Sequence, residues 1–598
     1  MRPVVALVPL FAFLTGVGVF ASWETLPARH PEPVLLVANA PRVKLAVLVV
    51  FDQMRGDYPE KWKPLFGAGG FARLQTEGAW FTRCYYPYGT TTTGPGHASI
   101  LSGTCPDHHG IVNNYWYENG RETYCAASAR YTTVPPTPKA AADEKSAEKN
   151  ADEQPAEKKT VEKTSGSPDR LLVETVADVL KQTHGSRAKV FGLSLKDRSA
   201  ILPTGKQPDG AFWFDGRFVT STYYTEHLER NFPAWATAFN SRKVADQWFG
   251  KDWTQFRPDL DYVAWSGRDD VSGEGVGSKQ GRTFPHPMTG GLKGVGGAYY
   301  NALATSPYGN NLLLAFASTC ISAEGLGRHA SPDLLVLSFS SNDLIGHAWG
   351  PDSQEVLDVT LRTDALLAQL LGMLDTKVGK DNYVLALTAD HGICPLPEVS
   401  VARGTPAHRV EETTLRAAAE AHLRKTFGDG GVGASPKSGS GWIEAFMPPW
   451  FYLNPRLVAS ANRPREDVAQ ALADYLVSRP DVARAYTRAD LTGPSPTDEI
   501  GQRVRRSFYP DRCGDVYLVG QPFDLLGKGA QGKTGTTHGS PYAYDAYVPL
   551  MVYGPGISGG ARTEPVTPQA TAAIFAQFLG LRPPAAAEYS VPVTLEGK

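Results

Sequence analysis

The sequence predicts an α/β protein built on a doubly wound, mainly parallel sheet with helices on both faces. Four nearly continuous apolar runs, at residues 43–52, 188–195, 333–339 and 383–388, have the composition of strands that are buried on both sides. Segments with the helical spacing of apolar residues lie between these runs. Strands that alternate with helices are typical of parallel sheets, and a chain of 598 residues leaves room for insertions.

Bulk composition indicates a globular protein without a highly charged partner. Apolar residues make up 42% of the chain and aromatic residues 10%. The 59 basic and 61 acidic residues give a formal net charge of -2, so nucleic-acid binding is not expected.

Residues 1–21 have the pattern of a secretory signal peptide. Arg2 is followed by an apolar run from Val4 to Phe20 and then by small residues. The run is short for a membrane span, so an uncleaved anchor is the weaker alternative. We therefore expect a protein that is exported to the periplasm or secreted, with no membrane contact beyond the signal peptide.

The cysteines argue against a thiolate metal site or a redox motif, because none of them forms a CxxC pair. An exported protein folds in oxidising surroundings, so we expect some of the six to form disulfides. The six are Cys84, Cys105, Cys125, Cys320, Cys394 and Cys513.

The first part of the α/β core is expected at residues 43–135. Its strand ends at Asp52, and a helical segment follows through Gly78. The stretch from Thr90 to Ile100 then passes from β-branched hydroxyl residues, through Gly-Pro-Gly, into residues that form a helix. A hydroxyl at this point lies beside the unpaired N–H groups of a helix N-terminus, which attract an anion. Taken alone, a Thr-rich turn is the simpler interpretation.

The second part of the core is expected at residues 169–407. Before it, residues 136–168 are charged and almost free of bulky apolar residues, so we expect a disordered insertion. Residues 226–330, rich in Trp, Pro and Gly and without a clear period, are interpreted as a cap on the surface. Helices are predicted at 171–185 and 354–374 and a short strand at 211–214.

The last third of the chain contains an insertion and the end of the core. Residues 408–510 are interpreted as an inserted α+β unit, and residues 511–590 as the third part of the core. The insertion has helices near 411–426 and 465–478, and the core resumes with a strand at 548–554 and a helix from Thr567 to Gly580.

Four of the predicted strands end on charged residues. These are Asp52, Lys196 with Arg198, Asp343, and Asp390 with His391. One such strand end is common and often only caps the next helix. Because binding sites in open α/β sheets form at the carboxyl ends of strands, four charged ends on one edge indicate a functional site.

The residue types at these ends favour a metal site. Asp343 and His347 are four residues apart, so one helical turn brings both to the same side. Asp390 and His391 are adjacent, and His538 lies in a loop. Carboxylate and imidazole groups without thiolates suit zinc, or else manganese or cobalt.

Seven motifs together resemble the alkaline phosphatase superfamily, and most closely its secreted, Thr-nucleophile phosphatases related to type I phosphodiesterases and nucleotide pyrophosphatases. The resemblance runs from about Val43 to Gly556 and fails over residues 136–168. The motifs are centred on Asp52, Thr93, Asn114, Lys196 with Arg198, Asp343 with His347, Asp390 with His391, and His538.

The resemblance implies two Zn2+ per chain and a phosphothreonine intermediate on Thr93. One Zn2+ would be held by Asp343, His347 and His538, and the other by Asp52, Asp390, His391 and the Thr93 oxygen. Asn114, Lys196 and Arg198 would contact the phosphoryl oxygens. His97, His108 and His109 are expected to have packing or supporting roles.

Lys196 and Arg198 bear on the substrate class. A phosphate monoester is a dianion with three terminal oxygens, whereas in a diester a second organic group takes one of those places. Two cations beside Asn114 therefore favour monoester hydrolysis, and in the resembling family this pair likewise marks monoesterases. We expect a monomeric alkaline phosphatase that acts on small-molecule phosphate esters.

Other functions stay open at this stage. The main alternative is a phosphodiesterase or nucleotide pyrophosphatase on the same two-metal site. A sulfatase is disfavoured because that branch needs a Cys or Ser that becomes formylglycine, and a cofactor-independent phosphoglycerate mutase uses Ser. A binding protein that keeps the scaffold without turnover would be revealed by an absence of bound zinc.

Overall fold

The computed structural model describes residues 41–136, 166–429, 441–527 and 533–595. The expected signal peptide and nearly all of the expected insertion at 136–168 lie outside the described residues. Among the helices in the described part of the chain, none combines the length and apolar character needed to cross a bilayer.

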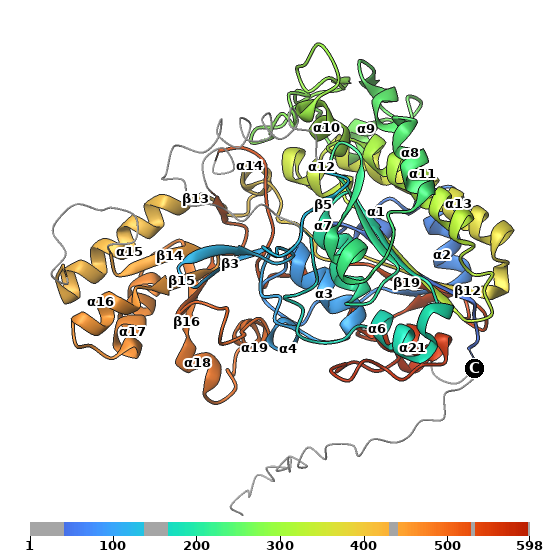
Figure 1. Ribbon diagram of the computed structural model, residues 1–598. Coiled ribbons are helices and arrows are strands. Elements are labelled where there is room, and N and C mark those ends of the chain that lie inside the picture. The colour runs from blue at the N-terminus through green and yellow to red at the C-terminus, as the bar shows by residue number, and fades with distance from the viewer. Residues whose placement is uncertain (1–40, 137–165, 430–440, 528–532, 596–598) are drawn as a thin grey trace, which may run out of the picture. The chain divides into compact units, whose positions relative to one another are not determined.

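A ten-stranded sheet forms the centre of the fold (Figure 1). Its strand order is β20-β2-β19-β12-β1-β11-β6-β7-β8-β5. Its five middle strands are all parallel, which confirms the predicted mainly parallel sheet. They are β12 (Tyr383–Thr388), β1 (Leu45–Phe51), β11 (Asp333–Phe339), β6 (Val190–Ser194) and β7 (Gly210–Phe214).

The outer strands include antiparallel pairs. The strand predicted at 548–554 is present as β19 (Leu550–Tyr553), but it runs antiparallel to β12. Next to it lie β2 (Ala79–Phe81) and β20 (Gly560–Arg562), which pair in parallel with each other. The opposite edge is formed by β8 (Phe218–Ser221) and β5 (Thr133–Val134), both antiparallel to their neighbours.

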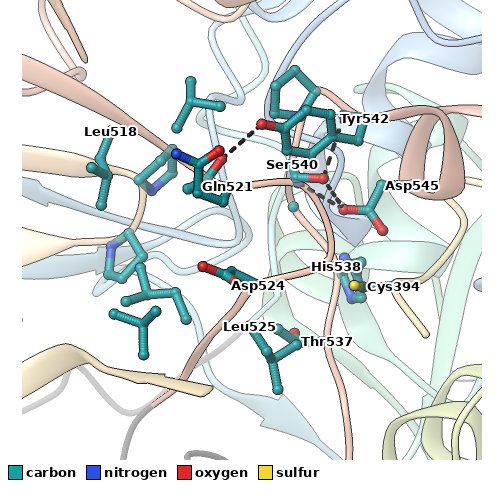
Figure 2. A pocket seen from close by; sticks show the side chains of 18 of the residues that line it. Cys394, Leu518, Gln521, Asp524, Leu525, Thr537, His538, Ser540, Tyr542 and Asp545 are labelled. Atoms are coloured by element: carbon teal, nitrogen blue, oxygen red, sulfur yellow. Dashed lines mark hydrogen bonds between the residues drawn. The ribbon is translucent and has the colours of Figure 1, made fainter. Parts of the chain in front are cut away.

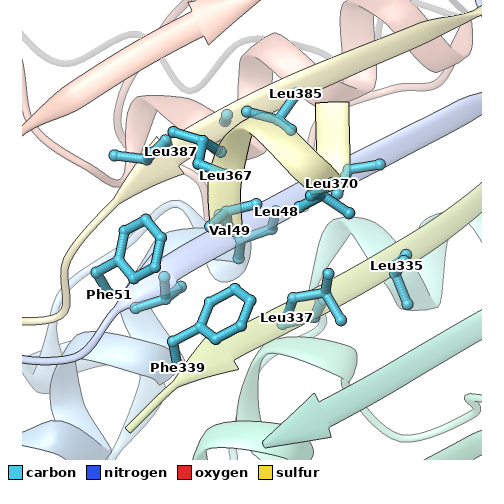
Figure 3. Close-up of a cluster of buried hydrophobic side chains, with 14 of the residues drawn as sticks. Leu48, Val49, Phe51, Leu335, Leu337, Phe339, Leu367, Leu370, Leu385 and Leu387 are labelled. Carbon is cyan, nitrogen blue, oxygen red and sulfur yellow. The ribbon is translucent and has the colours of Figure 1, made fainter. Parts of the chain in front are cut away.

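The central strands are apolar because both of their faces are covered. All seven residues of β1 are buried, and the ring of Phe51 stacks on that of Phe339 with centroids 5.1 Å apart. Leu367 and Leu370, on helix α13 (Gln354–Lys377), pack beside these strands (Figure 3). Burial of each such side chain contributes about 1.5–3 kcal/mol to folding.

Helices form two layers, as expected for a doubly wound sheet. In one layer, α21 (Ala570–Leu579) contacts β1 and packs with α3 (Thr93–Ser102) and α6 (Val176–His184). In the other, α13 packs with α2, α11 and α12. These three helices are α2 (Phe71–Glu77), α11 (Pro307–Glu324) and α12 (Ser341–Trp349).

The region predicted as a surface cap contains a core helix. Helix α11 buries residues along most of its length and contacts β6, β11 and α13. Its central residues, from Leu312 to Ala317, are apolar without a break, so the sequence shows no amphipathic period there. The rest of 226–330 holds the short elements α8 (Ala234–Ser241), β9 (Asp252–Trp253), α9 (Tyr262–Ser266), β10 (His286–Pro287) and α10 (Gly297–Ala304).

The predicted α+β insertion is built on a separate antiparallel sheet with the order β14-β15-β17-β16. Its strands are β14 (Ile443–Met447), β15 (Trp450–Leu453), β17 (Val516–Gly520) and β16 (Val482–Thr487). Since β17 lies between β15 and β16, the small sheet extends past the expected boundary at residue 510. Its helices are α15 (Glu412–Phe427), α16 (Pro455–Ser460), α17 (Arg465–Val477), α18 (Arg488–Thr492) and α19 (Glu499–Arg505).

The expected disulfides are not formed. All six cysteines are buried and free, and they lie in separate parts of the fold. Cys320 lies on α11, Cys105 contacts Gln569 and Tyr589, and Cys513 contacts the backbone of Ser507. Burial raises the pKa of the Cys105, Cys125 and Cys513 thiols to about 12, which disfavours the reactive thiolate.

Candidate active site

Three carboxylates converge at the carboxyl ends of neighbouring parallel strands. Asp52 directly follows β1, Asp390 comes two residues after β12, and Asp343 lies in the first turn of α12, just after β11. Their exposed fractions are 0%, 0% and 3%. Because β12, β1 and β11 are adjacent and parallel, the topology itself places the three side chains at one edge.

Three histidines complete the cluster. His347 lies one turn beyond Asp343 on α12, and its Nε2 is 3.2 Å from Asp343 Oδ1. His538 Nε2 approaches the same oxygen at 3.6 Å. The rings of His538 and His391 stack with centroids 3.5 Å apart.

Backbone carbonyls orient all three imidazoles. The Nδ1 atoms of His347, His391 and His538 lie 2.7, 2.9 and 2.9 Å from the carbonyl oxygens of Thr536, Gly392 and Thr91. A carbonyl only accepts hydrogen bonds, so Nδ1 carries the proton and the Nε2 lone pair faces the carboxylates. For His538, burial lowers the pKa well below its usual range, and the charges of His391 and His347 act in the same direction.

The electrostatics of the cluster fit a divalent cation. Asp52 Oδ1 is buried and receives no hydrogen bond from any described residue. Asp390 Oδ2 is also buried, and the neighbouring His97 Nδ1, at 3.2 Å, lies closer to the Thr93 carbonyl oxygen, at 2.9 Å. Burial raises the pKa of Asp52 well above its usual value, and the neighbouring charge of Asp390 adds to the effect. Buried carboxylates that lack donors and face imidazole lone pairs need a positive charge between them.

Two groups of ligand atoms have the spacing of a metal site. In the group Asp343, His391 and His538, and in the group Asp52, Asp390 and His391, one atom per residue lies within 4.8 Å of the others. His391 thus belongs to both groups, whereas the resemblance assigned it only to the second. His347 lies within contact distance of Asp343, as expected. The nitrogen and oxygen donor set suits zinc.

Thr93 is the first residue of α3, so the Gly-Pro-Gly sequence that was expected to precede the helix forms its first turn instead. Its Oγ1 lies 3.4 Å from His391 Nε2, and Arg198 Nη2 lies 3.4 Å from the same oxygen. The backbone N–H of Gly94 donates to Asn114 Oδ1 at 2.7 Å. Thr93, Arg198 and Asn114 are therefore gathered at the N-terminus of α3, where the helix dipole favours an anion.

Lys196 lies between two of the carboxylates. Its Nζ donates to Asp52 Oδ2 at 2.7 Å and to Asp343 Oδ2 at 2.5 Å. Burial alone would lower the pKa of Lys196, but the charges of Asp343 and Asp52 outweigh it and leave the pKa raised. The ammonium group thus lies where the two candidate groups of metal ligands meet.

Gln53 was not singled out by sequence, although it directly follows Asp52. Its backbone N–H donates to Asp390 Oδ1 at 3.0 Å, and its Nε2 donates to Asp343 Oδ1 at 2.6 Å. To do both, Gln53 adopts a φ of +72°, which non-glycine residues rarely do. Nothing in its residue type signals this role.

His97, His108 and His109, for which packing or supporting roles were expected, all contact neighbouring groups. His97 Nδ1 lies 2.9 Å from the Thr93 carbonyl oxygen and 3.2 Å from Asp390 Oδ2, and its Nε2 lies 2.8 Å from Ser338 Oγ. His109 is held against Ser99, and His108 pairs with the adjacent Asp107.

Carboxylate and imidazole donors beside a hydroxyl at a helix N-terminus are the arrangement that metal-dependent hydrolases use. A family model described as type I phosphodiesterase / nucleotide pyrophosphatase matches residues 46–541. The chain belongs to the type I phosphodiesterase / nucleotide pyrophosphatase family, within the alkaline phosphatase superfamily.

Two alkaline phosphatases and a crystal structure of one of them confirm the resemblance and the fold. Alkaline phosphatase PafA of Elizabethkingia meningoseptica is 33% identical over 531 residues, which cover 88% of this chain and 89% of that protein. Alkaline phosphatase PhoV of Synechococcus elongatus is 30% identical over 547 residues, or 88% of each chain. The crystal structure of PafA, at 32% identity, has a TM-score of 0.80 and covers 93% of this chain and 99% of that one.

A second crystal structure shows a variant of PafA in which four residues are replaced: a threonine, an asparagine, a lysine and an arginine. In the PafA sequence, one residue separates that lysine from that arginine. The variant is 31% identical to this chain, with a TM-score of 0.80. The order Thr93, Asn114, Lys196 and Arg198 presents the same four residue types with the same gap.

Proposed function

We propose that the protein is a zinc-dependent alkaline phosphatase that hydrolyses phosphate monoesters through a phosphothreonine on Thr93. The observation that carries the proposal is the position of Thr93 Oγ1, at the start of α3 and 3.4 Å from both His391 and Arg198. The named relatives support the phosphatase activity.

Two Zn2+ would be held by the carboxylates and imidazoles of the cluster. Asp343, His347 and His538 would bind one, and Asp52, Asp390, His391 and the Thr93 oxygen the other, with His391 close to both. Bound there, the ions supply positive charge that stabilises the attacking and leaving oxygens of an in-line displacement. The buried carboxylate oxygen Asp52 Oδ1, which receives no hydrogen bond from any described residue, supports this assignment.

The protein's own groups position the ester and the nucleophile. Thr93 Oγ1 attacks phosphorus, the bond to the alcohol oxygen breaks, and water later hydrolyses the phosphothreonine to inorganic phosphate. The Arg198 guanidinium faces the same oxygen and would pair with the phosphoryl group. Asn114 uses Oδ1 to hold the Gly94 N–H, which leaves its Nδ2 to donate to a phosphoryl oxygen.

Lys196 and Arg198 favour a monoester over a diester. The two cations would neutralise the second negative charge that only a monoester carries, and Lys196 would contact the phosphoryl oxygens from its place between the two groups of ligands. The family also includes enzymes that cleave diesters, so a phosphodiesterase on the same site is the competing function.

A paired assay tests the proposal. We expect the wild-type protein to hydrolyse p-nitrophenyl phosphate at least tenfold faster than bis-p-nitrophenyl phosphate, and a chelator to abolish both activities until Zn2+ is restored. Thr93→Ala should lose at least about 10³-fold in kcat, because the nucleophile is removed. Faster diester hydrolysis, or a Thr93→Ala variant with normal turnover, would contradict the proposal.

The proposal also covers the export of the protein and its oligomeric state. We propose that the protein is exported with residues 1–21 as its signal peptide and that it acts as a monomer. N-terminal sequencing of the mature protein and its mass in solution test the two statements directly.

A further inference from the structure

A cavity of about 140 Å³ adjoins the candidate active site (Figure 2). Thr92 and His538 form the wall that it shares with the cluster. Its other walls come from the small sheet and the segment after it, including Leu518, Asp524 and Leu525. The cavity is therefore bounded by the core on one side and by the insertion on another.

The position of this cavity indicates which part of an ester could enter it. Asn114, Lys196 and Arg198, the residues proposed to contact the phosphoryl oxygens, do not line it. Thr92, which does, immediately precedes the proposed nucleophile. When the phosphorus of an ester lies at Thr93, the alcohol portion extends away from it. The cavity beside Thr92 is the space that this portion could occupy.

Carboxylates give the cavity a negative character. Among the described residues that line it there is no lysine or arginine, but there are three aspartates: Asp481, Asp524 and Asp545. Asp481 is already neutralised by Arg479, at 2.7 Å. Asp545 Oδ2 accepts hydrogen bonds from the Ser540 hydroxyl and N–H.

Asp524 is the aspartate best placed to act on a ligand. Its side chain is only 4% exposed, and Figure 2 shows it among Leu525, His538 and Gln521. Oδ1 accepts the His408 N–H at 2.8 Å and lies 3.1 Å from His408 Nδ1, while Oδ2 takes part in neither contact. Burial raises the pKa of Asp524, so a neighbouring cation would stabilise its ionised form.

Aromatic rings line the same cavity. Tyr542 is fixed by the hydrogen bond from its hydroxyl to the Gly520 carbonyl at 2.7 Å, and its ring lies 5.6 Å from that of Tyr544. Tyr517, also in the lining, is held near Thr90 by a contact of 3.3 Å between their hydroxyl oxygens. Tyrosine rings together with a carboxylate are the surroundings that bind alkylammonium groups.

We propose that this cavity, here named the alcohol cavity, receives the leaving alcohol of the ester and that Asp524 selects alcohols carrying an ammonium group over alcohols carrying an anionic group. The substrate class is then the phosphate monoesters of amino alcohols. This inference rests on the proposed function, because it concerns the alcohol that the phosphatase releases.

Selectivity among three monoesters tests the inference. We expect wild-type kcat/KM to fall at least tenfold from choline phosphate to glycerol phosphate, and further for 3-phosphoglycerate, whose alcohol carries a carboxylate. Asp524→Asn should shrink the ratio between choline phosphate and 3-phosphoglycerate at least tenfold, and Asp524→Glu should restore most of it. His408→Ala, which removes the outer partner of Asp524 but keeps the carboxylate, should preserve the ratio.

Inhibition by the alcohols provides a second measurement on the wild-type protein alone, in case a variant fails to fold. Choline should compete with p-nitrophenyl phosphate at least tenfold more strongly than glycerol or glycerate does. Equal inhibition by the three alcohols, or an unchanged ratio in Asp524→Asn, would overturn the inference while p-nitrophenyl phosphate hydrolysis left the proposed function standing. Loss of activity on every monoester would instead overturn the proposed function, and the inference with it.

Discussion

Single residues hold the candidate site together by serving two groups at once. Gln53 donates to Asp390 through its backbone and to Asp343 through its side chain. A left-handed backbone at a non-glycine residue costs about 1–3 kcal/mol, so it persists only where the surroundings enforce it. The strain at Gln53 is therefore the cost of fixing two carboxylates, one in each candidate group of metal ligands, with one side chain and one peptide.

Lys196 and Arg198 decide the preference for monoesters in the proposed mechanism. Replacing both with Ala should lower kcat/KM for p-nitrophenyl phosphate by about 10³-fold, because two charge-assisted contacts are lost. The loss for bis-p-nitrophenyl phosphate should be about tenfold or less, since a diester has one charge fewer to neutralise. Steady-state kinetics on the two substrates measure the difference.

The matched control is Lys380→Ala, which removes an exposed lysine that pairs with Glu77 away from the site. It should leave both rates unchanged. Equal losses for the two substrates in the double variant would refute a role of the two cations in choosing the substrate. Zinc content should be measured alongside, because Lys196 also contacts Asp52 and Asp343.

At the scale of elements, the seating of α3 on the end of β12 sets the position of Thr93. A Cβ on Gly96 would lie 2.3 Å from the Asp390 carbonyl oxygen and 2.6 Å from the Asp390 Cβ. Backbone cannot yield as a flexible side chain does, so only glycine allows this approach. Thr93, the proposed nucleophile, and the candidate metal ligands after β12 are thereby held at a fixed separation.

Gly96→Ala should therefore push α3 away from Asp390. We expect a loss of about 1–3 kcal/mol in the free energy of unfolding and about 10²-fold in kcat, because a displacement near 1 Å at the nucleophile is enough for that. Chemical denaturation and kinetics measure the two effects.

Gly372→Ala is the opposite case on the exposed face of α13, where an added Cβ meets nothing within 4 Å. It should stabilise the protein by about 0.5–1 kcal/mol, the difference in helix propensity, and leave kcat alone. If Gly96→Ala behaved like Gly372→Ala, the close packing at Asp390 would have no functional importance.

Much of this arrangement follows from sequence, because it depends on strands buried on both faces. The parallel strands β1, β6, β11 and β12 are continuous apolar runs, and the charged residues after them mark the edge where they meet. A helix near the Thr-rich stretch was also expected, but its start at Thr93 was not, because Gly94, Pro95 and Gly96 were expected to precede the helix and instead form its first turn.

Other features depend on partners that the local sequence does not encode. Helix α11 is buried on most sides and so lacks a period, and the antiparallel direction of β19 is fixed by the path of the chain rather than by its own residues. Lys196 contacts two carboxylates, Asp52 and Asp343, that lie far apart in the sequence, and Gln53 gains its role from its backbone conformation.

At the scale of the whole molecule, a rise in pH toward the alkaline range lowers the stability of the fold. Glu274 is 2% exposed, and burial raises its pKa from the ordinary 4.5 to about 9, although the Val271 N–H donates to its carboxylate. The folded state therefore holds a proton that the unfolded state releases from about pH 4.5 upward. The stability contributed by the protonated form is present at low pH and is lost as the pH rises toward 9.

Glu274→Gln should remove this dependence. Between pH 6 and 8 the wild-type free energy of unfolding should fall, relative to the variant, by about 1.4 kcal/mol for each pH unit. Urea unfolding at several pH values, with zinc present throughout, measures the slope. Asp381→Asn, at an exposed surface position, serves as the control. Its free energy of unfolding should change with pH as that of the wild type does. If the free energy of Glu274→Gln did the same, the prediction would be wrong.

The strand pair formed by β13 (Arg409–Glu411) and β18 (Leu525–Gly527) gives the insertion an unusual junction. These strands pair in parallel, with Arg409 opposite Leu525 and Glu411 opposite Gly527, so the chain enters and leaves the small sheet side by side. A recombination that exchanged this block between related genes would place both crossover points in one strand pair. It would replace the wall of the alcohol cavity that carries Asp524 and leave Thr93 in place. Under the proposals above, the preferred alcohol would then change while the residues that handle the phosphoryl group stayed the same.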